Sequence, residues 1–466
     1  MSFASVALCP ALEEVVNFPG FVGRFGLSLD DPILIFLNIA ESLNPMRVME
    51  SDSLASVKLR FQSIKGFFVK KQKLFYDGRE LARDYLHHEL ILDGENGENV
   101  IHLLIKNSSK VLAKPKNFSV EPVAVNREIE LSALLKDLIS STIEGLEKGN
   151  APIKSSDGSG GAYFMQDQSG HKYISVFKPI DEEPMAVNNP HGQPLSLDGE
   201  GLKKGTQVGE GAFREVAAYL LDYPIIGPRS SPHDQRGFAG VPPTTMVKCL
   251  HKDFNHPNGY SFSQENAKIG SLQMFVSNVG TCEDMGYGAF PVDQVHKISV
   301  LDIRLANADR HGGNILVSRD GNDGQIVLTP IDHGYCFPNK FEDCTFEWLY
   351  WPQAKEPYSS ETLEYIKALD AEQDIELLRF HGWEIPPSCA RVFRISTILL
   401  KKGAAKGLTP FAIGSIMCRE TLEKESVIEQ IIYDAEAIVS QETTEEEFIS
   451  IVSDIMDRYL NQCSLN

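Results

Sequence analysis

Two aspartates and an asparagine lie at spacings that suit phosphoryl transfer. Asp309 and Asn314 stand five residues apart in ADRHGGNILV, and Asp332 follows a second apolar stretch in LTPIDHG. Carboxylate and amide oxygens are ligands that Mg²⁺ accepts, and a carboxylate can take the proton of an acceptor hydroxyl. The spacing predicts Asp309 as a catalytic base and Asn314 and Asp332 as metal ligands. The plainer alternative is a pair of Asp- and Gly-containing turns between strands.

A lysine and a glutamate upstream would complete the charges of such a site. Lys178 ends the apolar stretch 174–177 and precedes Pro179, so its ammonium would reach the α- and β-phosphates of ATP. Glu215 lies in a predicted amphipathic helix at 211–221 and would form the lysine–glutamate ion pair that kinases need. The alternatives are a lysine stem that covers apolar surface at a domain edge and a solvated glutamate.

A glycine-rich run between two predicted strands is suited to bind phosphates. Residues 157–161 have the sequence DGSGG and precede strand-like stretches at 162–164 and 173–177. Small residues let backbone N–H groups approach phosphate oxygens closely. Taken alone the run also fits a linker, but with the lysine downstream it predicts an ATP-binding loop. The predicted loop contacts to ATP are Ser159, Gly160, Gly161, Ala162 and Tyr163.

Composition restricts the partners and the location of the chain. The 466 residues include 44 Lys and Arg against 64 Asp and Glu, a net charge of −20. This balance argues against a nucleic-acid partner, which needs a basic face, and limits membrane contact to a local, peripheral one. The eight cysteines form no C-x-x-C pair, which indicates a reducing compartment and no zinc site. No apolar run approaches the roughly 20 residues of a membrane span. We expect a cytoplasmic protein, with nuclear or membrane-peripheral locations as alternatives.

The first part of the chain predicts a small, strand-rich domain. Stretches at 33–37, 46–49, 73–76 and 100–105 predict strands, with a turn at Asn44-Pro45 and a helix at 54–61. Their order and the sequences SDSLASVKLR, QKLFYDGREL and VIHLLIK resemble ubiquitin over residues 32–107. No terminal Gly-Gly follows, so the resemblance implies a fixed β-grasp domain. Phe75 and Leu104 fall near ubiquitin's apolar recognition patch, which implies docking to ubiquitin-pathway proteins; ordinary core positions are the alternative.

Residues 108–150 are predicted to be a linker and a helix. Pro115 and Pro122 mark 111–125 as the linker. Apolar residues at helical spacing across 128–147 predict an amphipathic helix that packs on the following domain. A target helix for a partner is the alternative.

The chemistry-bearing motifs resemble one family. ADRHGGNILV and PIDHGYCFP resemble the catalytic and activation loops of the phosphatidylinositol 3/4-kinase superfamily. GGAYF, VFKPIDEEP, GSLQMFVSN and WLYWPQAKEPYS resemble type II phosphatidylinositol 4-kinases, and their union with ubiquitin-like sequence resembles the plant gamma class. The resemblance implies a kinase that uses ATP and Mg²⁺, with Mn²⁺ as an alternative ion, and a catalytic role for Lys178 on the phosphates. It also implies an adenine-binding hinge at Gln273, Met274, Phe275 and Val276.

Two departures from that family pattern matter. Residues 185–205 contain no cysteine, where the animal type II enzymes have a palmitoylated cysteine-rich stretch. Stable lipid anchoring takes two signals, so we do not expect it here. His311 stands where the animal type II catalytic loop has glycine.

We therefore expect an α+β chain: a β-grasp ubiquitin-like domain and then a two-lobed phosphatidylinositol 3/4-kinase-like catalytic domain at 151–445. The small lobe, about 151–276, should be an antiparallel sheet with one helix. The large lobe, about 277–445, should contain the catalytic loops, and a mostly helical segment is expected at 360–460. The predicted reaction moves the γ-phosphoryl group of ATP to the 4-hydroxyl of phosphatidylinositol. A serine/threonine protein kinase acting on ubiquitin-pathway or signalling proteins is the first alternative, and a ubiquitin-like adaptor with little kinase activity is the second. An exposed apolar and basic patch beside the active site would favour the lipid.

Overall fold

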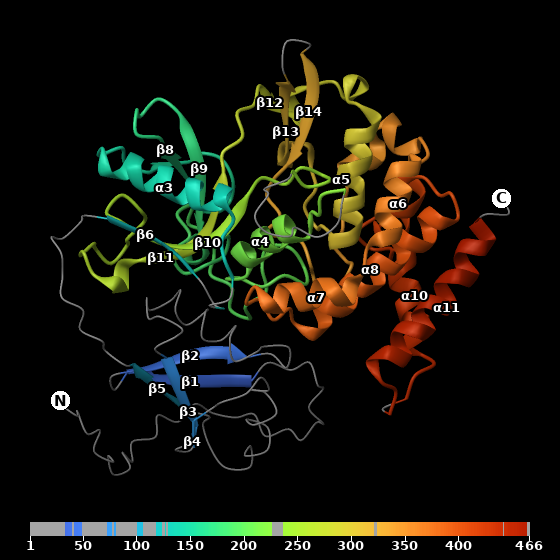
Figure 1. Ribbon diagram of the computed structural model, residues 1–466. Coiled ribbons are helices and arrows are strands. Elements are labelled where there is room, and N and C mark those ends of the chain that lie inside the picture. The colour runs from blue at the N-terminus through green and yellow to red at the C-terminus, as the bar shows by residue number, and fades with distance from the viewer. Residues whose placement is uncertain are drawn as a thin grey trace.

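The computed structural model of the chain (Figure 1) describes residues 33–39, 42–48, 72–76, 79–80, 100–105, 118–123, 126, 129–225, 236–320, 324–440 and 442–463. Three sheets and a large group of helices make up this part of the chain.

The first sheet has the strand order β2-β1-β5-β3-β4, with β1 and β5 parallel and the other pairs antiparallel. Its strands are β1 (Ile33–Ile39), β2 (Ser42–Val48), β3 (Gln72–Tyr76), β4 (Arg79–Glu80) and β5 (Val100–Ile105). This arrangement agrees with the expected β-grasp domain. The predicted turn at Asn44-Pro45 is wrong, because both residues lie inside β2. Proline is tolerated there because β2 is an edge strand. The helix predicted at 54–61 lies outside the described residues.

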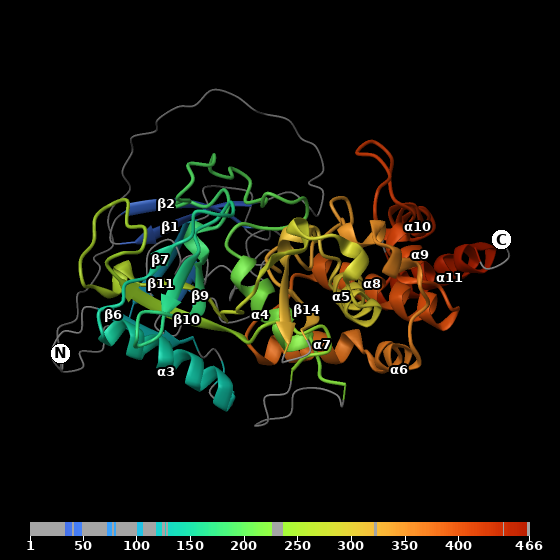
Figure 2. The same cartoon turned by 90° about the horizontal axis from the view of Figure 1, so that it is seen from above.

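A six-stranded antiparallel sheet forms the small lobe of the second domain, in the order β6-β10-β11-β9-β8-β7. The strands are β6 (Phe118–Pro122), β7 (Ile153–Lys154), β8 (Tyr163–Gln166), β9 (Tyr173–Pro179), β10 (Thr244–His251) and β11 (Lys268–Met274). Two helices, α3 (Ala133–Glu147) and α4 (Gly211–Leu221), pack on this sheet. Figure 2 shows both beside the strands.

The two helices cover opposite faces of the sheet. On α3, Thr142 Oγ1 lies 2.9 Å from Oγ of Ser175, whereas Lys178, three residues further along β9, contacts α4. Side chains alternate between the faces of a strand, so residues an odd number apart point to opposite sides. The central strand β9 thus has one face in the core under α3 and presents Lys178 on the other.

The small lobe begins earlier in the chain than predicted. β6 pairs with β10 along its whole length, and α3 packs on β6, β8 and β9. The expected packing of the amphipathic helix on the following domain is confirmed. The expected linker at 111–125 is wrong for β6, whose short sequence FSVEP buries only Val120 and therefore shows no clear strand pattern.

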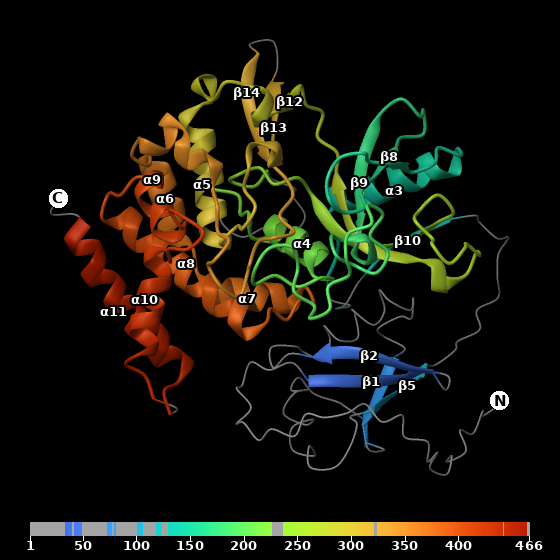
Figure 3. The same cartoon turned by 180° about the vertical axis from the view of Figure 1, so that it is seen from behind.

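The large lobe combines a three-stranded sheet, in the order β12-β13-β14, with a bundle of helices (Figure 3). Its elements are β12 (Gly280–Thr281), α5 (Val292–Leu305), β13 (Ile315–Asp320), β14 (Gln325–Pro330), α6 (Ser360–Ala368), α7 (Ala371–Phe380), α8 (Pro387–Ala405), α9 (Pro410–Met417), α10 (Val427–Glu436) and α11 (Glu445–Cys463). The predicted helical character is confirmed. The lobe does not end at 445, because α11 packs on α8 and α10 through buried apolar residues.

A buried ionic contact fixes the end of α4 against the large lobe. Arg304, in the last turn of α5, donates from Nη1 to the carbonyl oxygen of Leu221 at 2.7 Å and from Nη2 to Asp374 on α7. Tyr223 donates its hydroxyl to the same Asp374. Charged groups this deeply buried need such partners. The helix that bears Glu215 is thereby tied to the helix that leads into the catalytic loop.

Candidate active site between the two lobes

Lys178 joins the small lobe to the loop that bears Asp332. Its Nζ lies 2.6 Å from Oε1 of Glu215 on α4 and forms a second ion pair with Asp332, which follows β14. The predicted lysine–glutamate pair is therefore present. Glu215 is almost fully buried, whereas Asp332 is the most exposed of the three.

The charges of this cluster support one another. Burial disfavours the ammonium of Lys178, but the carboxylates of Asp332 and Glu215 outweigh it and raise the pKa of the lysine. Burial likewise disfavours the Glu215 carboxylate, but the adjacent ammonium lowers the pKa of Glu215. Both groups are charged at neutral pH. A fixed positive charge in a partly dry site is what the phosphates of a nucleotide require.

A glutamate from another segment caps the helix that bears Glu215. Glu183 accepts hydrogen bonds from the backbone N–H groups of Gly209 at 2.7 Å and Ala212 at 3.3 Å, at the N-terminus of α4. The first N–H groups of a helix have no partner within it, so an external acceptor fixes the helix start. Burial raises the pKa of the Glu183 carboxyl to about 8, against the effect of the two N–H donors.

The catalytic loop begins where α5 ends. Ala306 adopts a left-handed conformation, with φ of 48°, and turns the chain out of the helix. The backbone N–H of Asp309 donates to Oδ1 of Asn307 at 2.9 Å, and Nδ2 of Asn314 donates to the carbonyl oxygen of Asp309 at 2.9 Å. The loop therefore brings Asp309 and Asn314 together. One carboxylate oxygen of Asp309 lies 2.8 Å from Nζ of Lys203.

Arg310 links the catalytic loop to the loop that bears Asp332. It is fully buried and donates from Nε to both carboxylate oxygens of Asp302 at 3.0 Å. Its Nη1 donates to the carbonyl oxygens of Asn314 and Ile331, which joins the catalytic loop to the residue before Asp332. Buried hydrogen bonds from a charged donor are stronger than neutral ones, so they hold both loops in place. Asp332 itself has a positive φ of 57°, a conformation that Asp tolerates better than most residues.

Hydrogen bonds to the segment after β9 hold the glycine-rich loop in place. The N–H of Gly161 donates to the carbonyl oxygen of Glu182 at 2.8 Å, and Asn189 donates to the carbonyl oxygen of Ser159 at 2.8 Å. A Cβ at Gly161 would lie 2.7 Å from Cβ of Glu182, so only glycine fits. The loop contacts predicted at Ser159, Gly160 and Ala162 remain predictions. The N–H of Gly161 has its acceptor inside the protein.

The predicted ATP contact through the side chain of Tyr163 is wrong. Tyr163 is buried, donates its hydroxyl to Glu182 Oε2 at 2.7 Å and accepts from the N–H of Asn255 at 2.9 Å. The strand alternation of β8 turns it away from the nucleotide face. Glu182 in turn pairs with the buried Lys268 at 2.8 Å. These residues hold the loop in place.

Two of the predicted hinge donors are already engaged. The N–H of Met274 donates to the carbonyl oxygen of Pro243 at 2.8 Å, and the N–H of Phe275 donates to that of Ile174 at 2.9 Å. Neither can donate to adenine in this arrangement, because β11 lies between two strands there. In the part of the chain that the structure describes, the N–H of Val276 has no such acceptor.

The side chains of the remaining hinge residues have other surroundings. The Gln273 amide donates to Oγ1 of Thr244 at 3.0 Å and lies beside Glu215. The ring of Phe275 packs edge-on against Phe164 and Tyr173, with centroids 5.9 and 5.4 Å away. This aromatic cluster borders the hinge and was not predicted, because its members are far apart in the sequence.

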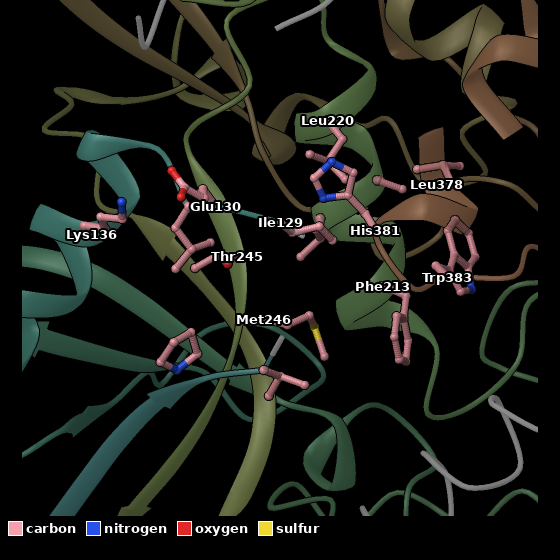
Figure 4. Close-up of a pocket in the computed structure, with 15 residues that line it drawn as sticks. Ile129, Glu130, Lys136, Phe213, Leu220, Thr245, Met246, Leu378, His381 and Trp383 are labelled. Atoms are coloured by element: carbon pink, nitrogen blue, oxygen red, sulfur yellow. The ribbon is translucent and has the colours of Figure 1, made fainter. Parts of the chain in front are cut away.

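A separate cavity of about 420 Å³ lies beside α4 (Figure 4). Its walls come from α4, β10, the segment before α3 and the end of α7, including Phe213, Leu220, Met246, His381 and Trp383. None of the predicted site residues lines it. It is a mainly apolar space beside the helix and not the nucleotide site.

Comparison with known proteins decides the family. The family model described as phosphatidylinositol 3- and 4-kinase matches residues 158–413, more than half of the chain, and the ubiquitin family model matches residues 35–108. The chain belongs to the phosphatidylinositol 3- and 4-kinase family. It is 68% identical to phosphatidylinositol 4-kinase gamma 3 of Arabidopsis thaliana, and the alignment covers 100% of each chain.

Other members of the family match along the full chain as well. The chain is 48% identical to phosphatidylinositol 4-kinase gamma 4 of Arabidopsis thaliana, with 99% of each chain covered. It is 46% identical to phosphatidylinositol 4-kinase gamma 4 of Oryza sativa subsp. japonica, with 100% of this chain and 99% of the relative covered. The described helices include none with the length and hydropathy of a membrane span.

Membership of this kinase family implies the use of ATP and a divalent metal, and the residues present fit both. The described residues hold no group of three His, Cys, Asp or Glu side chains that would bind a metal alone. Asn314 uses its Nδ2 on Asp309, which leaves its oxygen for a ligand, and Asp332 offers a partly exposed carboxylate. Two protein oxygens plus nucleotide phosphates are a common way to hold such an ion.

The sequence did not indicate two groups that the structure places at the site. Lys203 comes from a glycine-rich segment without helical or strand periodicity, so nothing marked it as a neighbour of Asp309. Arg310 stands beside Asp309 in the chain, but its burial against Asp302 depends on the fold. Only the position of Arg310 between two candidate residues was a usable signal.

Proposed function

We propose that this chain transfers the γ-phosphoryl group of ATP to the 4-hydroxyl of phosphatidylinositol, using Mg²⁺. One observation supports the lipid acceptor above all. The segment 185–205, which reaches Asp309 through Lys203, also exposes large apolar side chains. These are Val187 (58% exposed), Leu195 (54%), Leu197 (82%) and Leu202 (47%). Several relatives are named phosphatidylinositol 4-kinases, which agrees with this acceptor.

A segment with exposed apolar side chains beside the catalytic loop suits an acceptor that lies in a membrane. Exposed large apolar side chains mark contact sites for proteins or membranes when they lie together on the surface. The exposed leucines can enter the acyl region of a membrane. The strongly acidic composition of the whole chain restricts such contact to this local surface. We propose a peripheral, reversible encounter from the cytoplasmic side, without a second anchor.

Different residues of the protein carry out different parts of the reaction. Asp309 accepts a hydrogen bond from the acceptor hydroxyl and takes its proton as the oxygen attacks phosphorus. Lys178, held by Glu215, stabilises negative charge on the phosphates. Asp332 and Asn314 would hold Mg²⁺, which when bound neutralises charge on the phosphate oxygens. Arg310 fixes both loops, so that these groups keep their relative positions during the reaction.

A serine or threonine acceptor in a protein has no specific support in the structure. An adaptor role does not account for the assembled charges of Lys178, Glu215 and Asp332, which are costly to bury without a use for them. The ubiquitin-like domain suggests contact with other proteins, and we propose ubiquitin-pathway partners for it.

Phosphorylation of phosphatidylinositol in vesicles tests this function. The expected product is phosphatidylinositol 4-phosphate, identified by the position of the new phosphate. A variant with Leu195, Leu197 and Leu202 all changed to serine should lose most activity on vesicles. Its rate on a short-chain soluble phosphatidylinositol should stay within about threefold. The matched control is Ile438→Ser, an exposed apolar residue after α10. Equal vesicle rates for wild type and the triple variant would refute the role of this surface.

A further inference from the structure

A lysine ammonium occupies one oxygen of the proposed catalytic carboxylate. Nζ of Lys203 lies 2.8 Å from Oδ1 of Asp309, and both side chains are only partly exposed. An acceptor hydroxyl has to reach this carboxylate to be deprotonated. The ammonium therefore has to share the carboxylate or move when the acceptor arrives.

Lys203 lies in a turn held by backbone hydrogen bonds. The N–H of Gly201 donates to the carbonyl oxygen of Thr206 at 2.7 Å, and the hydroxyl of Thr206 donates to the carbonyl oxygen of Lys203 at 2.6 Å. Two backbone contacts fasten this turn to the segment after Asp332. The N–H of Lys204 donates to Asp343 at 2.7 Å, and the N–H of Asn339 donates to the carbonyl oxygen of Gly205 at 2.8 Å.

The neighbouring cations are already neutralised by other groups. Lys204 pairs with Glu200 at 2.9 Å, and Lys340 pairs with Glu200 at 3.4 Å and with Glu342 at 3.5 Å. Among the described residues, Lys203 is the lysine whose ion-pair partner is the proposed base itself. When the carboxylate turns to an incoming hydroxyl, this ammonium needs a new anion within reach of its flexible stem.

Phosphatidylinositol brings such an anion. Its phosphodiester sits at C1 of the inositol ring, opposite the 4-hydroxyl, and lies between the ring and the acyl chains. Lys203 likewise contacts Asp309, and the exposed Leu202 immediately precedes it in the chain. A ring with its 4-hydroxyl at Asp309 and its tails toward the leucines would place the phosphodiester along this segment.

We propose that Lys203 is the residue that binds the phosphodiester of the acceptor headgroup. Its ammonium leaves Asp309 as the lipid arrives, so binding of an acidic headgroup frees the base. This inference rests on the proposed function and explains how the site would select a phosphorylated inositol. An inositol without the phosphate would not bind Lys203 and would not fully release Asp309.

The test measures acceptor and nucleotide parameters separately in the full-length protein. The variants are Lys203→Ala, Lys203→Arg and the matched control Lys204→Ala, each checked for an unchanged melting temperature. Phosphatidylinositol is supplied in detergent mixed micelles at varied surface concentration. We expect Lys203→Ala to raise the KM for the lipid at least tenfold and to leave the KM for ATP within about twofold. Lys203→Arg should recover most of the loss, and Lys204→Ala should behave as wild type.

Competition by soluble headgroups measures the contribution of the phosphate to acceptor binding. Inositol 1-phosphate should inhibit wild type at least tenfold better than Lys203→Ala, whereas myo-inositol should inhibit both equally weakly. A higher KM for ATP in Lys203→Ala would overturn the proposal in favour of a nucleotide contact. Faster turnover of Lys203→Ala on every acceptor would overturn it in favour of an inhibitory plug. Absence of lipid product from wild type would instead refute the proposed function. Lipid product with equal parameters for Lys203→Ala and Lys204→Ala refutes this inference alone.

Discussion

Lys178 has two carboxylate partners, although one would neutralise it. Glu215 is the buried partner and Asp332 the exposed one, so the two are not equivalent. With a nucleotide bound, we expect Asp332 to turn to the metal while Glu215 keeps the lysine in place. The same logic applies to Asp309 and Lys203. In each pair, we expect the bound substrate to replace one of the two ion-pair partners.

Asp332→Ala should abolish Mg²⁺-dependent ATP binding, because the variant lacks the carboxylate proposed to hold the ion that bridges the phosphates. Calorimetric titration with Mg-ATP measures this, and we expect an affinity loss of at least tenfold. Asp309→Asn is the control, because Asp309 faces the acceptor and its variant should bind nucleotide normally. Unchanged affinity in Asp332→Ala means that Asp332 is structural.

Glu183 should make stability depend on pH in the neutral range. Its folded pKa of about 8 is above the reference value of about 4.3, so folding favours the protonated form. The stabilising contribution is complete below pH 4.3 and is lost as pH rises to about 8. Glu183→Gln should therefore gain stability relative to wild type between pH 5 and 8. Urea unfolding at several pH values tests this, and a constant difference between the two proteins would contradict it.

Side-chain chemistry made part of the site predictable. Asp309, Asn314 and Asp332 were identified because their types and spacing limit what they can do. The role of Tyr163 was misjudged, because strand alternation decides which side of β8 faces the nucleotide. Lys203 and Glu183 were not found, since their contacts to Asp309 and α4 join distant segments.

At the level of elements, the pairing of β11 with β9 sets the position of Lys178. Gly270 on β11 lies opposite Pro179, next to the backbone of Lys178. A Cβ there would overlap the carbonyl oxygen of Lys178 and lie 2.8 Å from Cα of Pro179. Only glycine allows the two strands to approach this closely.

Gly270→Ala should separate β11 from β9 and displace Lys178. We expect a loss of about 1–3 kcal/mol in the free energy of unfolding, typical of overpacking, and weaker ATP binding. Gly286→Ala is the matched control, because a Cβ at Gly286 meets no atom within 4 Å. Denaturant unfolding and nucleotide titration of both variants decide the matter. If Gly270→Ala behaves as Gly286→Ala does, the strand contact does not position the lysine.

Element prediction succeeded where a pattern was long and failed where it was short. The apolar spacing of α3 and that of α4 were sufficient. β6 was taken for a linker, because five residues with one buried position and a proline give little signal and depend on β10 for their structure. The turn expected at Pro45 failed because an edge strand accepts proline.

For the whole molecule, the position of β6 defines where the chain can be divided. The kinase region begins at Phe118, and the ubiquitin-like sheet ends at Ile105. The register of that sheet pairs position 104 with 73 and position 102 with 75, which places Phe75 and Leu104 on one face. Such a shared face agrees with a docking role and remains a prediction.

Residues 111–466 alone should keep the full-length rate of ATP-dependent phosphorylation. They retain β6 and α3, and the residues removed include none of the site. In pull-downs the same truncation should lose ubiquitin-pathway partners. Residues 129–466 are the contrasting truncation: without β6, β10 becomes an open edge and we expect poor solubility. An inactive 111–466 protein would show that the two domains share a core.

The central claim is that this protein phosphorylates phosphatidylinositol and that Asp309 is its catalytic base. Full-length protein and Asp309→Asn are given radiolabelled ATP with phosphatidylinositol micelles and, in parallel, a generic protein substrate. General-base catalysis contributes about 10²–10⁴-fold. We predict label in phosphatidylinositol 4-phosphate, far less in the protein, and a loss of that order in Asp309→Asn with nucleotide binding intact. Label mainly in the protein substrate, or an Asn variant within a factor of about two of wild type, would contradict the account.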